Sequence, residues 1–106
     1  MEKNGVMGFK KFSPVNIILW QMLAGTLGGY TRGFILNKLA DKPYNTDQLA
    51  EALNIDHETI SHHLNVLANN GIITAESHEY GRIYFLSKDM EAKLKDFNQI
   101  WGKINL

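Results

Sequence analysis

Two short helices, each with its own start signal, constrain the fold of this chain more than any other feature of its sequence. The first is capped by Asn45, and Gln48 three positions later completes a capping box. It ends at Asn54, a residue type that tolerates the left-handed conformation found at helix ends. The second is capped by Asp56 and ends at Gly71. About three residues join them, and this arrangement predicts a helix-turn-helix unit.

A β-hairpin is expected directly after the second of these helices. Residues 72–76 and 82–86 read as strands, and the polar turn 77–81 between them ends in a glycine. A helix-turn-helix followed by a hairpin is a winged helix. We therefore predict an α+β fold: a winged helix-turn-helix that is helix-rich, with one β-hairpin wing and extra terminal helices.

The terminal segments complete a single domain. Residues 1–12 show no hydrophobic period and are predicted to form a flexible N-terminal arm, which leaves a winged helix domain over residues 13–106. A first helix starts at Ser13 and is apolar nearly all round, and Ser87 caps one last helix.

Another helix is expected over about 32–40, between the first helix and the helix-turn-helix. Thr31 is placed to cap it, and Pro43 enforces its end. The spacing of its apolar residues leaves Arg32 on the outer side.

The first and last helices carry more aromatic surface than a small winged helix needs. The apolar residues of the last helix recur at spacings of four and three, the narrow seam of a coiled-coil-like contact. Either both helices close the core of their own chain, or they form a homodimer, and we favour the homodimer. Whether the first helix packs within the subunit or across the dimer stays open. The predicted dimer interface consists of Trp20, Leu23, Met90, Leu94, Phe97, Trp101 and Ile104.

Composition excludes several classes of function. Lys and Arg number 11, as do Asp and Glu, so no global charge attracts the chain to nucleic acid. The absence of cysteine excludes disulfides and thiolate chemistry, and it favours a cytoplasmic location. The apolar stretch 15–27 is shorter than the roughly 20 residues of a membrane span, so no membrane partner is expected. No catalytic constellation is recognisable, so neither an enzyme nor a cofactor is predicted.

The segment 48–73, QLAEALNIDHETISHHLNVLANNGII, resembles the helix-turn-helix of the ArsR-like family of winged-helix transcriptional regulators. Its part TISHHLNVL is especially similar to that family's recognition helix, and the wider resemblance covers nearly everything after residue 12. The resemblance implies a homodimer on double-stranded DNA, with one recognition helix per subunit in the major groove and the wing beside it. By position it implies that His57, Glu58, Thr59, Ser61 and His62 read bases and that Arg82 is the wing contact.

Few basic residues support this function. The predicted recognition helix, about 57–70, has no Lys or Arg, although Asn65 adds a polar group to its outer face. Contacts to DNA phosphates must therefore come from other parts of the chain, namely Arg32, Lys38, Lys42, Arg82 and the arm residues Lys10 and Lys11. The alternative is a winged helix that serves as a protein–protein interaction module without DNA binding.

The sequence does not support a metal site. Thiolate metal sensors of the ArsR-like family carry a Cys-x-Cys motif where this chain has Asn45 and Asp47, and the last helix lacks the histidine of the other family site. The His-Glu pair at His57 resembles a zinc motif, but Ser61 occupies the position of the second ligand. His63 lies on the apolar face of its helix and is predicted to be a buried neutral imidazole.

Overall fold

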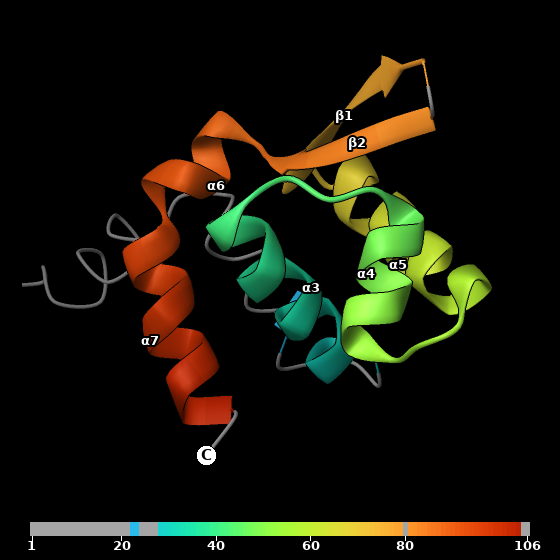
Figure 1. Ribbon diagram of the computed structural model, residues 1–106. Helices are drawn as coiled ribbons and strands as arrows, with labels where there is room; N and C mark the ends of the chain where they lie inside the picture. The colour runs from blue at the N-terminus through green and yellow to red at the C-terminus, as the bar shows by residue number, and fades with distance from the viewer. Residues whose placement is uncertain (1–21, 24–27, 80, 105–106) are drawn as a thin grey trace, which may run out of the picture.

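The computed structural model describes residues 22–23, 28–79 and 81–104 (Figure 1). The predicted arm and most of the predicted first helix, including Trp20, lie outside these residues. In chain order the elements are α3 (Gly29–Asp41), α4 (Thr46–Leu53), α5 (His57–Asn69), β1 (Ile73–His78), β2 (Gly81–Leu86), α6 (Lys88–Ala92) and α7 (Leu94–Ile104). This arrangement confirms the winged helix-turn-helix.

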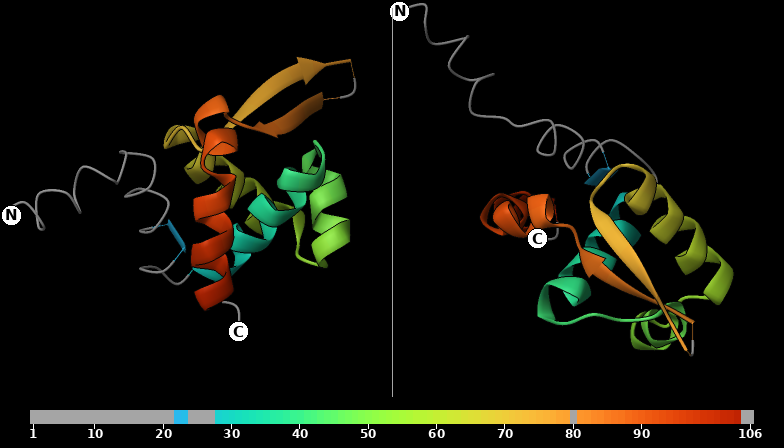
Figure 2. Two further views of the ribbon diagram at one scale, coloured as in Figure 1. Left: turned by 90° about the vertical axis from the view of Figure 1, so that its left-hand side faces the viewer. Right: turned by 90° about the horizontal axis from the view of Figure 1, so that it is seen from above.

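Helix α3 lies at the centre of the described fold. It packs against the α4–α5 pair on one side and against α7 on the other (Figures 1 and 2). The hairpin of β1 and β2 projects beyond the helices, and its base contacts α3, α4, α5 and α6. No helix formed by the described residues is long and apolar enough to cross a membrane.

The signals that start and stop the helices act as predicted. Asn45 accepts a hydrogen bond from the backbone of Gln48 at 2.7 Å, and the Gln48 side chain accepts one from the backbone of Asn45 at 2.8 Å. Asn54 adopts the left-handed conformation, with φ 57° and ψ 46°. Ser87 caps α6 by accepting a hydrogen bond from the backbone of Met90 at 3.0 Å. These interactions span only a few residues, which is why local sequence predicts them.

Two helix predictions need correction. Helix α3 begins at Gly29 with Gly28 in the cap position, so Thr31 lies within the helix and does not cap it. The last helix is not continuous, because the backbone at Lys93 leaves helical geometry, with φ −111° and ψ 16°. This break separates the short helix α6 from α7.

The wing is longer than the sequence predicted. Strands β1 and β2 are antiparallel, and their register pairs Ile73 with Leu86 at the base and His78 with Gly81 at the tip. The turn therefore does not include residues 77 and 78, which were placed in it. Gly81 has a φ of 117°, a conformation that L-amino acids with a side chain rarely adopt. This explains why a glycine is the first residue of β2 after the turn. Tyr44 adds one further bridge to Tyr84 on β2.

One hydrophobic core joins all these elements. Helix α5 contributes a stripe of buried side chains, and α3 and the base of the wing close over it. The buried apolar residues are Leu23, Ile35, Leu36, Leu39, Leu49, Ile60, Leu64, Leu67, Ile72, Ile73, Tyr84, Leu86, Met90, Phe97 and Trp101. This core fixes α5 so that one side of the helix faces solvent.

Candidate nucleic-acid interface

Helix α5 presents a polar face to solvent. Its buried side consists of Ile60, His63, Leu64 and Leu67. Its exposed side consists of Glu58, His62, Asn65 and Asn69, with Ser61 half-buried at the edge. Imidazole, amide and hydroxyl groups donate and accept hydrogen bonds, and such groups can read the edges of bases in the major groove of DNA. The structure therefore exposes His62 and Asn65 side by side, as the sequence predicted.

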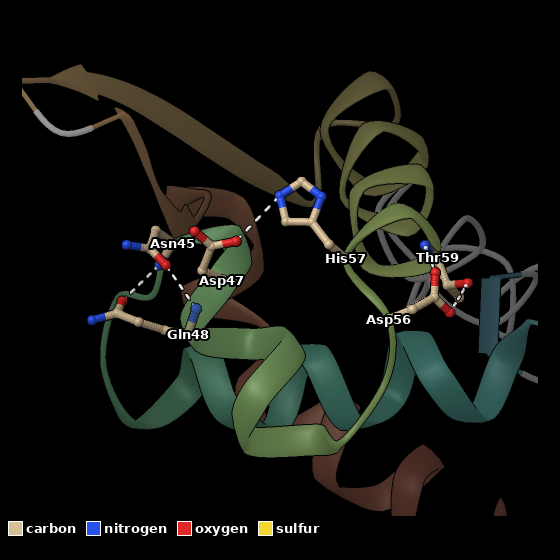
Figure 3. Close-up of polar contacts among 6 residues, drawn as sticks. All are labelled: Asn45, Asp47, Gln48, Asp56, His57 and Thr59. Carbon is tan, nitrogen blue, oxygen red and sulfur yellow. Dashed lines mark hydrogen bonds and ion pairs between the residues drawn. The ribbon is translucent and has the colours of Figure 1, made fainter.

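The first turn of α5 is occupied by its own cap. Asp56 accepts hydrogen bonds from the hydroxyl of Thr59 at 2.8 Å and from the backbone N–H of Thr59 at 3.0 Å (Figure 3). The hydroxyl bond first, and then the backbone bond, lower the pKa of Asp56 below its usual value. The carboxylate thus stays charged, and the hydroxyl of Thr59 is engaged inside the chain.

A shallow hollow brings the wing to the start of the helix-turn-helix. It is lined by Asn45, Thr46, Asp47, His57, Gly81 and Arg82. Across it, Nε2 of His57 lies 3.3 Å from a carboxylate oxygen of Asp47, so α5 reaches back toward α4 at this point (Figure 3). Arg82 and His57, which lie far apart in the sequence, therefore share one side of the molecule. The sequence alone does not reveal Asp47 as a neighbour of His57, because only the packing of α4 against α5 creates that contact.

The remaining charges near the wing are few and mixed. Lys42 is exposed, and its Nζ lies 5.4 Å from the centre of the Tyr44 ring, which itself bridges to β2. His78 on β1 lies 3.4 Å from a carboxylate oxygen of Glu76. The exposed cations Lys42 and Arg82 thus lie at the base and along the edge of the wing, and acidic groups are interspersed with them.

Arg32 does not belong to this surface, contrary to the prediction. Only 5% of its surface is exposed, and its guanidinium points into the molecule toward His63 on α5. The apolar spacing of α3 suggested the opposite, because a charged residue was assumed to avoid the core. Phe34, an apolar residue of the same helix, is 40% exposed. His63 is buried as predicted.

Several residues assigned to a dimer interface are covered by their own chain. Met90 and Phe97 are completely buried, and Trp101 is 8% exposed. Trp101 packs edge-on against Tyr30 and Phe34 of α3, with ring centres 6.1 and 5.1 Å away. The assignment of these three as direct contacts to a partner is therefore revised: they close the core, which was the alternative. Leu23 is also buried, Leu94 is half-buried, and the side chain of Ile104 lies outside the described part of the chain.

Within the residues that the structure describes, no three histidine, aspartate or glutamate side chains gather into a group that could hold a metal ion. His57 and Asp47 form a pair without a third such neighbour in that part of the chain. The chemistry available at this surface is hydrogen bonding and the charge of Arg82 and Lys42.

Fold and surface together define a winged helix-turn-helix protein. Residues 31–75, from α3 into β1, match the model of the family described as "Bacterial regulatory protein, arsR family". This match confirms, for the segment 31–75, the resemblance to that family found in the sequence. A search of curated protein sequences finds no match to the chain.

Solved structures share this fold at low sequence identity. The transcriptional regulator HlyU from Vibrio vulnificus is 20% identical, with a TM-score of 0.69 over 92% of this chain and 98% of that one. A mutant of ZitR from Lactococcus lactis is 20% identical, with a TM-score of 0.64 over 72% of this chain, which spans 54% of the ZitR chain. The overoxidized form of AbfR, in a structure with DNA, is 15% identical, with a TM-score of 0.65 over 96% of this chain and 82% of that one.

Proposed function

We propose that this chain is a sequence-specific DNA-binding transcriptional regulator that acts as a homodimer in the cytoplasm, with α5 in the major groove and the wing beside it. The observation that carries the proposal is the exposed polar face of α5 with Arg82 at its start. The match to a family of regulatory proteins supports it, as does the similar fold of AbfR, whose structure contains DNA.

The side chains take two roles in this proposal. His62, Ser61 and Asn65 contact base edges, because they lie on the solvent side of α5 and carry both donors and acceptors. His57 and Glu58 lie at the helix start, and Thr59 contributes less because its hydroxyl is engaged by Asp56. Arg82 and Lys42 contact phosphates, since they are exposed cations on or beside the wing.

The direct test is a selection of bound fragments from genomic DNA, followed by affinity measurements on the selected site and on random DNA. His62→Ala should weaken binding to the selected site more than to random DNA, by about 1–3 kcal/mol of discrimination if a good base contact is lost. Arg82→Ala should weaken both equally and flatten the salt dependence by about one unit of slope per subunit, or about two for the dimer.

Lys103→Ala is the matched control for Arg82→Ala. It also removes one exposed positive charge, but from α7, which ends on the side of the molecule away from the wing (Figure 1). It should leave DNA affinity and its salt dependence unchanged. If the chain instead binds a protein partner through α5, no DNA fragment is selected, and binding changes little between about 50 and 200 mM salt.

The dimer interface is proposed to lie on the outer surface where α3 meets α7. Tyr30 is 55% exposed and Phe34 is 40% exposed, and both flank the buried Trp101. Half-buried Leu94 and Ile100 extend the apolar surface along α7. Replacing Tyr30 and Phe34 together with alanine should give a folded monomer in sedimentation experiments, whereas an unchanged dimer would contradict this placement.

A further inference from the structure

The buried side of α5 holds a polar pair that is shielded from direct contact with DNA. Arg32 and His63 are only 5% and 8% exposed, and a terminal nitrogen of Arg32 lies 3.1 Å from Nδ1 of His63. A guanidinium has donors and no acceptor, so Nδ1 of His63 must accept the hydrogen bond. His63 is therefore neutral, with its proton on Nε2.

The same guanidinium also binds the backbone at residue 22. Nε of Arg32 donates to the carbonyl oxygen of Met22 at 2.9 Å. The sulfur of Met22 lies 4.0 Å from the side-chain nitrogen of Asn70, which also donates to the carbonyl of Val66 at 2.8 Å, at the end of α5. The segment 22–23 is thus joined to the middle of α5 through Arg32 and to its end through Asn70.

Two glycines make room for these contacts. A Cβ atom at Gly28 would lie 2.5 Å from Cε1 of His63 and 2.6 Å from a terminal nitrogen of Arg32. A Cβ atom at Gly29 would lie 1.9 Å from the carbonyl oxygen of Leu23. The absence of a side chain at Gly28 allows Arg32 and His63 to meet, and its absence at Gly29 allows the backbone of Leu23 to approach the start of α3.

We propose that Arg32 is a positioning residue for DNA recognition, because it holds α5 in a fixed rotation relative to residues 22–23 while His63 is neutral. The proposal rests on the proposed function of α5. His63 is adjacent in sequence to His62, and the two rings lie 5.4 Å apart. A displacement of His63 on the buried side therefore moves the exposed residues that would contact bases.

A fall in pH should break the hydrogen bond between Arg32 and His63. Burial, then the charge of Arg32, then His62, lower the pKa of His63 below its ordinary value of 6.5. Among the described residues, the charged and titratable groups that act on it are Arg32 from α3 and His62 from α5 itself. Protonation would turn the acceptor Nδ1 into a donor and place two positive charges side by side in a buried site, so the hydrogen bond would be lost.

Three substitutions test separately the acceptor atom of His63, its aromatic ring and the space around the Arg32–His63 pair. His63→Asn keeps an acceptor oxygen at the same number of bonds from Cβ but cannot titrate. His63→Phe keeps a ring and removes the acceptor. Gly28→Ala removes no polar group but pushes the pair apart. All are compared in a His62→Gln background, so that the exposed histidine contributes nothing to the pH dependence, and circular dichroism establishes that each variant is folded.

Affinity for the selected DNA is measured from pH 8 down to pH 5. At pH 8 we expect His63→Asn to bind within about twofold of the parent, and His63→Phe and Gly28→Ala to bind roughly tenfold more weakly. Below pH 6.5 the parent should lose affinity, and His63→Asn should not. If His63→Phe binds as tightly as the parent, or if His63→Asn loses affinity with acid as the parent does, the proposal is wrong.

A second measurement needs no DNA. The titration of His63 is followed by NMR in the parent and in Arg32→Met, which removes the charge and both hydrogen bonds. His63 should titrate at a higher pH in Arg32→Met, and the amide hydrogens of α5 should exchange faster. An unchanged titration and unchanged exchange would overturn the positioning role. A chain with the original sequence that binds no DNA refutes the proposed function, whereas DNA binding that stays unchanged in these variants refutes this inference alone.

Discussion

Replacing Gly33 with alanine would test how α3 packs against α7. A Cβ atom at this position would lie 2.0 Å from Cζ3 of Trp101 and 2.5 and 2.6 Å from two further ring atoms. Carbon atoms in contact are about 3.5–4.0 Å apart, so the ring would have to withdraw by roughly 1.5–2 Å. Phe97 is stacked on the ring at 6.2 Å between centres, and Phe34 packs edge-on at 5.1 Å. The ring therefore has little room to move.

Two effects of opposite sign determine how much Gly33→Ala changes the free energy of unfolding. Alanine is favoured over glycine inside a helix by about 1 kcal/mol. Forcing extra atoms into a well-packed core costs about 1–3 kcal/mol, and the upper end applies to Gly33→Ala because the short contacts are with a buried, anchored ring. We expect a net loss of about 1–2 kcal/mol in the free energy of unfolding. For a domain of this size that is a fall in Tm of roughly 5–15 °C.

Thermal and urea unfolding measure this change, and Gly102→Ala is the matched control. Gly102 is an exposed helical residue of α7, and a Cβ atom there would meet no atom within 4 Å. Gly102→Ala should therefore leave stability unchanged or raise it by up to about 1 kcal/mol. Combining Gly33→Ala with Trp101→Leu should cost less than the sum of the two single changes. If the free energy of unfolding of Gly33→Ala equals that of the parent, Trp101 does not pack against Gly33 as described.

Two further predictions address the cap and the buried histidine. Asn45→Ala should lower the free energy of unfolding by about 1 kcal/mol in urea, because the backbone N–H of Gln48 loses the side-chain oxygen that accepts its hydrogen bond, and Asn45→Asp should recover most of it. The pKa of His63 is lower in the folded chain than its ordinary value of 6.5. The stabilisation that neutral His63 provides should therefore be complete above pH 6.5 and be lost as the pH falls through the pKa of the folded chain. Urea unfolding should show this decline in the parent and not in His63→Asn.

The helix-turn-helix could be predicted from the sequence because its determinants are local. Asn45 and Gln48, like Asp56 and Thr59, interact across three residues, and their hydrogen bonds are the ones observed. Such pairs need no tertiary contact, so the order of residues is enough to identify them. The polar face of α5 follows for a similar reason, since helical periodicity alone separates it from the buried stripe.

The error at Arg32 has a tertiary cause. Its partners include the carbonyl of Met22 and the ring of His63, which are 10 and 31 residues away in the sequence. Helical spacing within α3 contains no information about either partner. A charged residue was therefore assigned to solvent, although hydrogen-bonded partners allow it to be buried.

The role of the last helix was ambiguous for a different reason. An amphipathic helix has the same sequence pattern whether a partner chain or its own chain covers its apolar side. Here α3 covers it, and the glycine at 33 lets the Trp101 ring approach the α3 backbone. A glycine inside a helix, opposite an aromatic ring, is the one signal in the sequence that could have favoured packing within the chain.

The distribution of charge sets a limit on how this surface can bind DNA. Asp47, Asp56 and Glu58 surround the start of α5, whereas Arg82 and Lys42 are the exposed arginine and lysine on or beside the wing. Counting only the described residues, two phosphate contacts per subunit give about four per dimer, for which the logarithm of the affinity should fall by about 3.6 per tenfold rise in salt. So shallow a dependence leaves little nonspecific attraction. Affinity must then come mainly from hydrogen bonds to bases, which is why the rotation of α5, and the Arg32–His63 pair behind it, should matter more here than in a strongly basic winged helix.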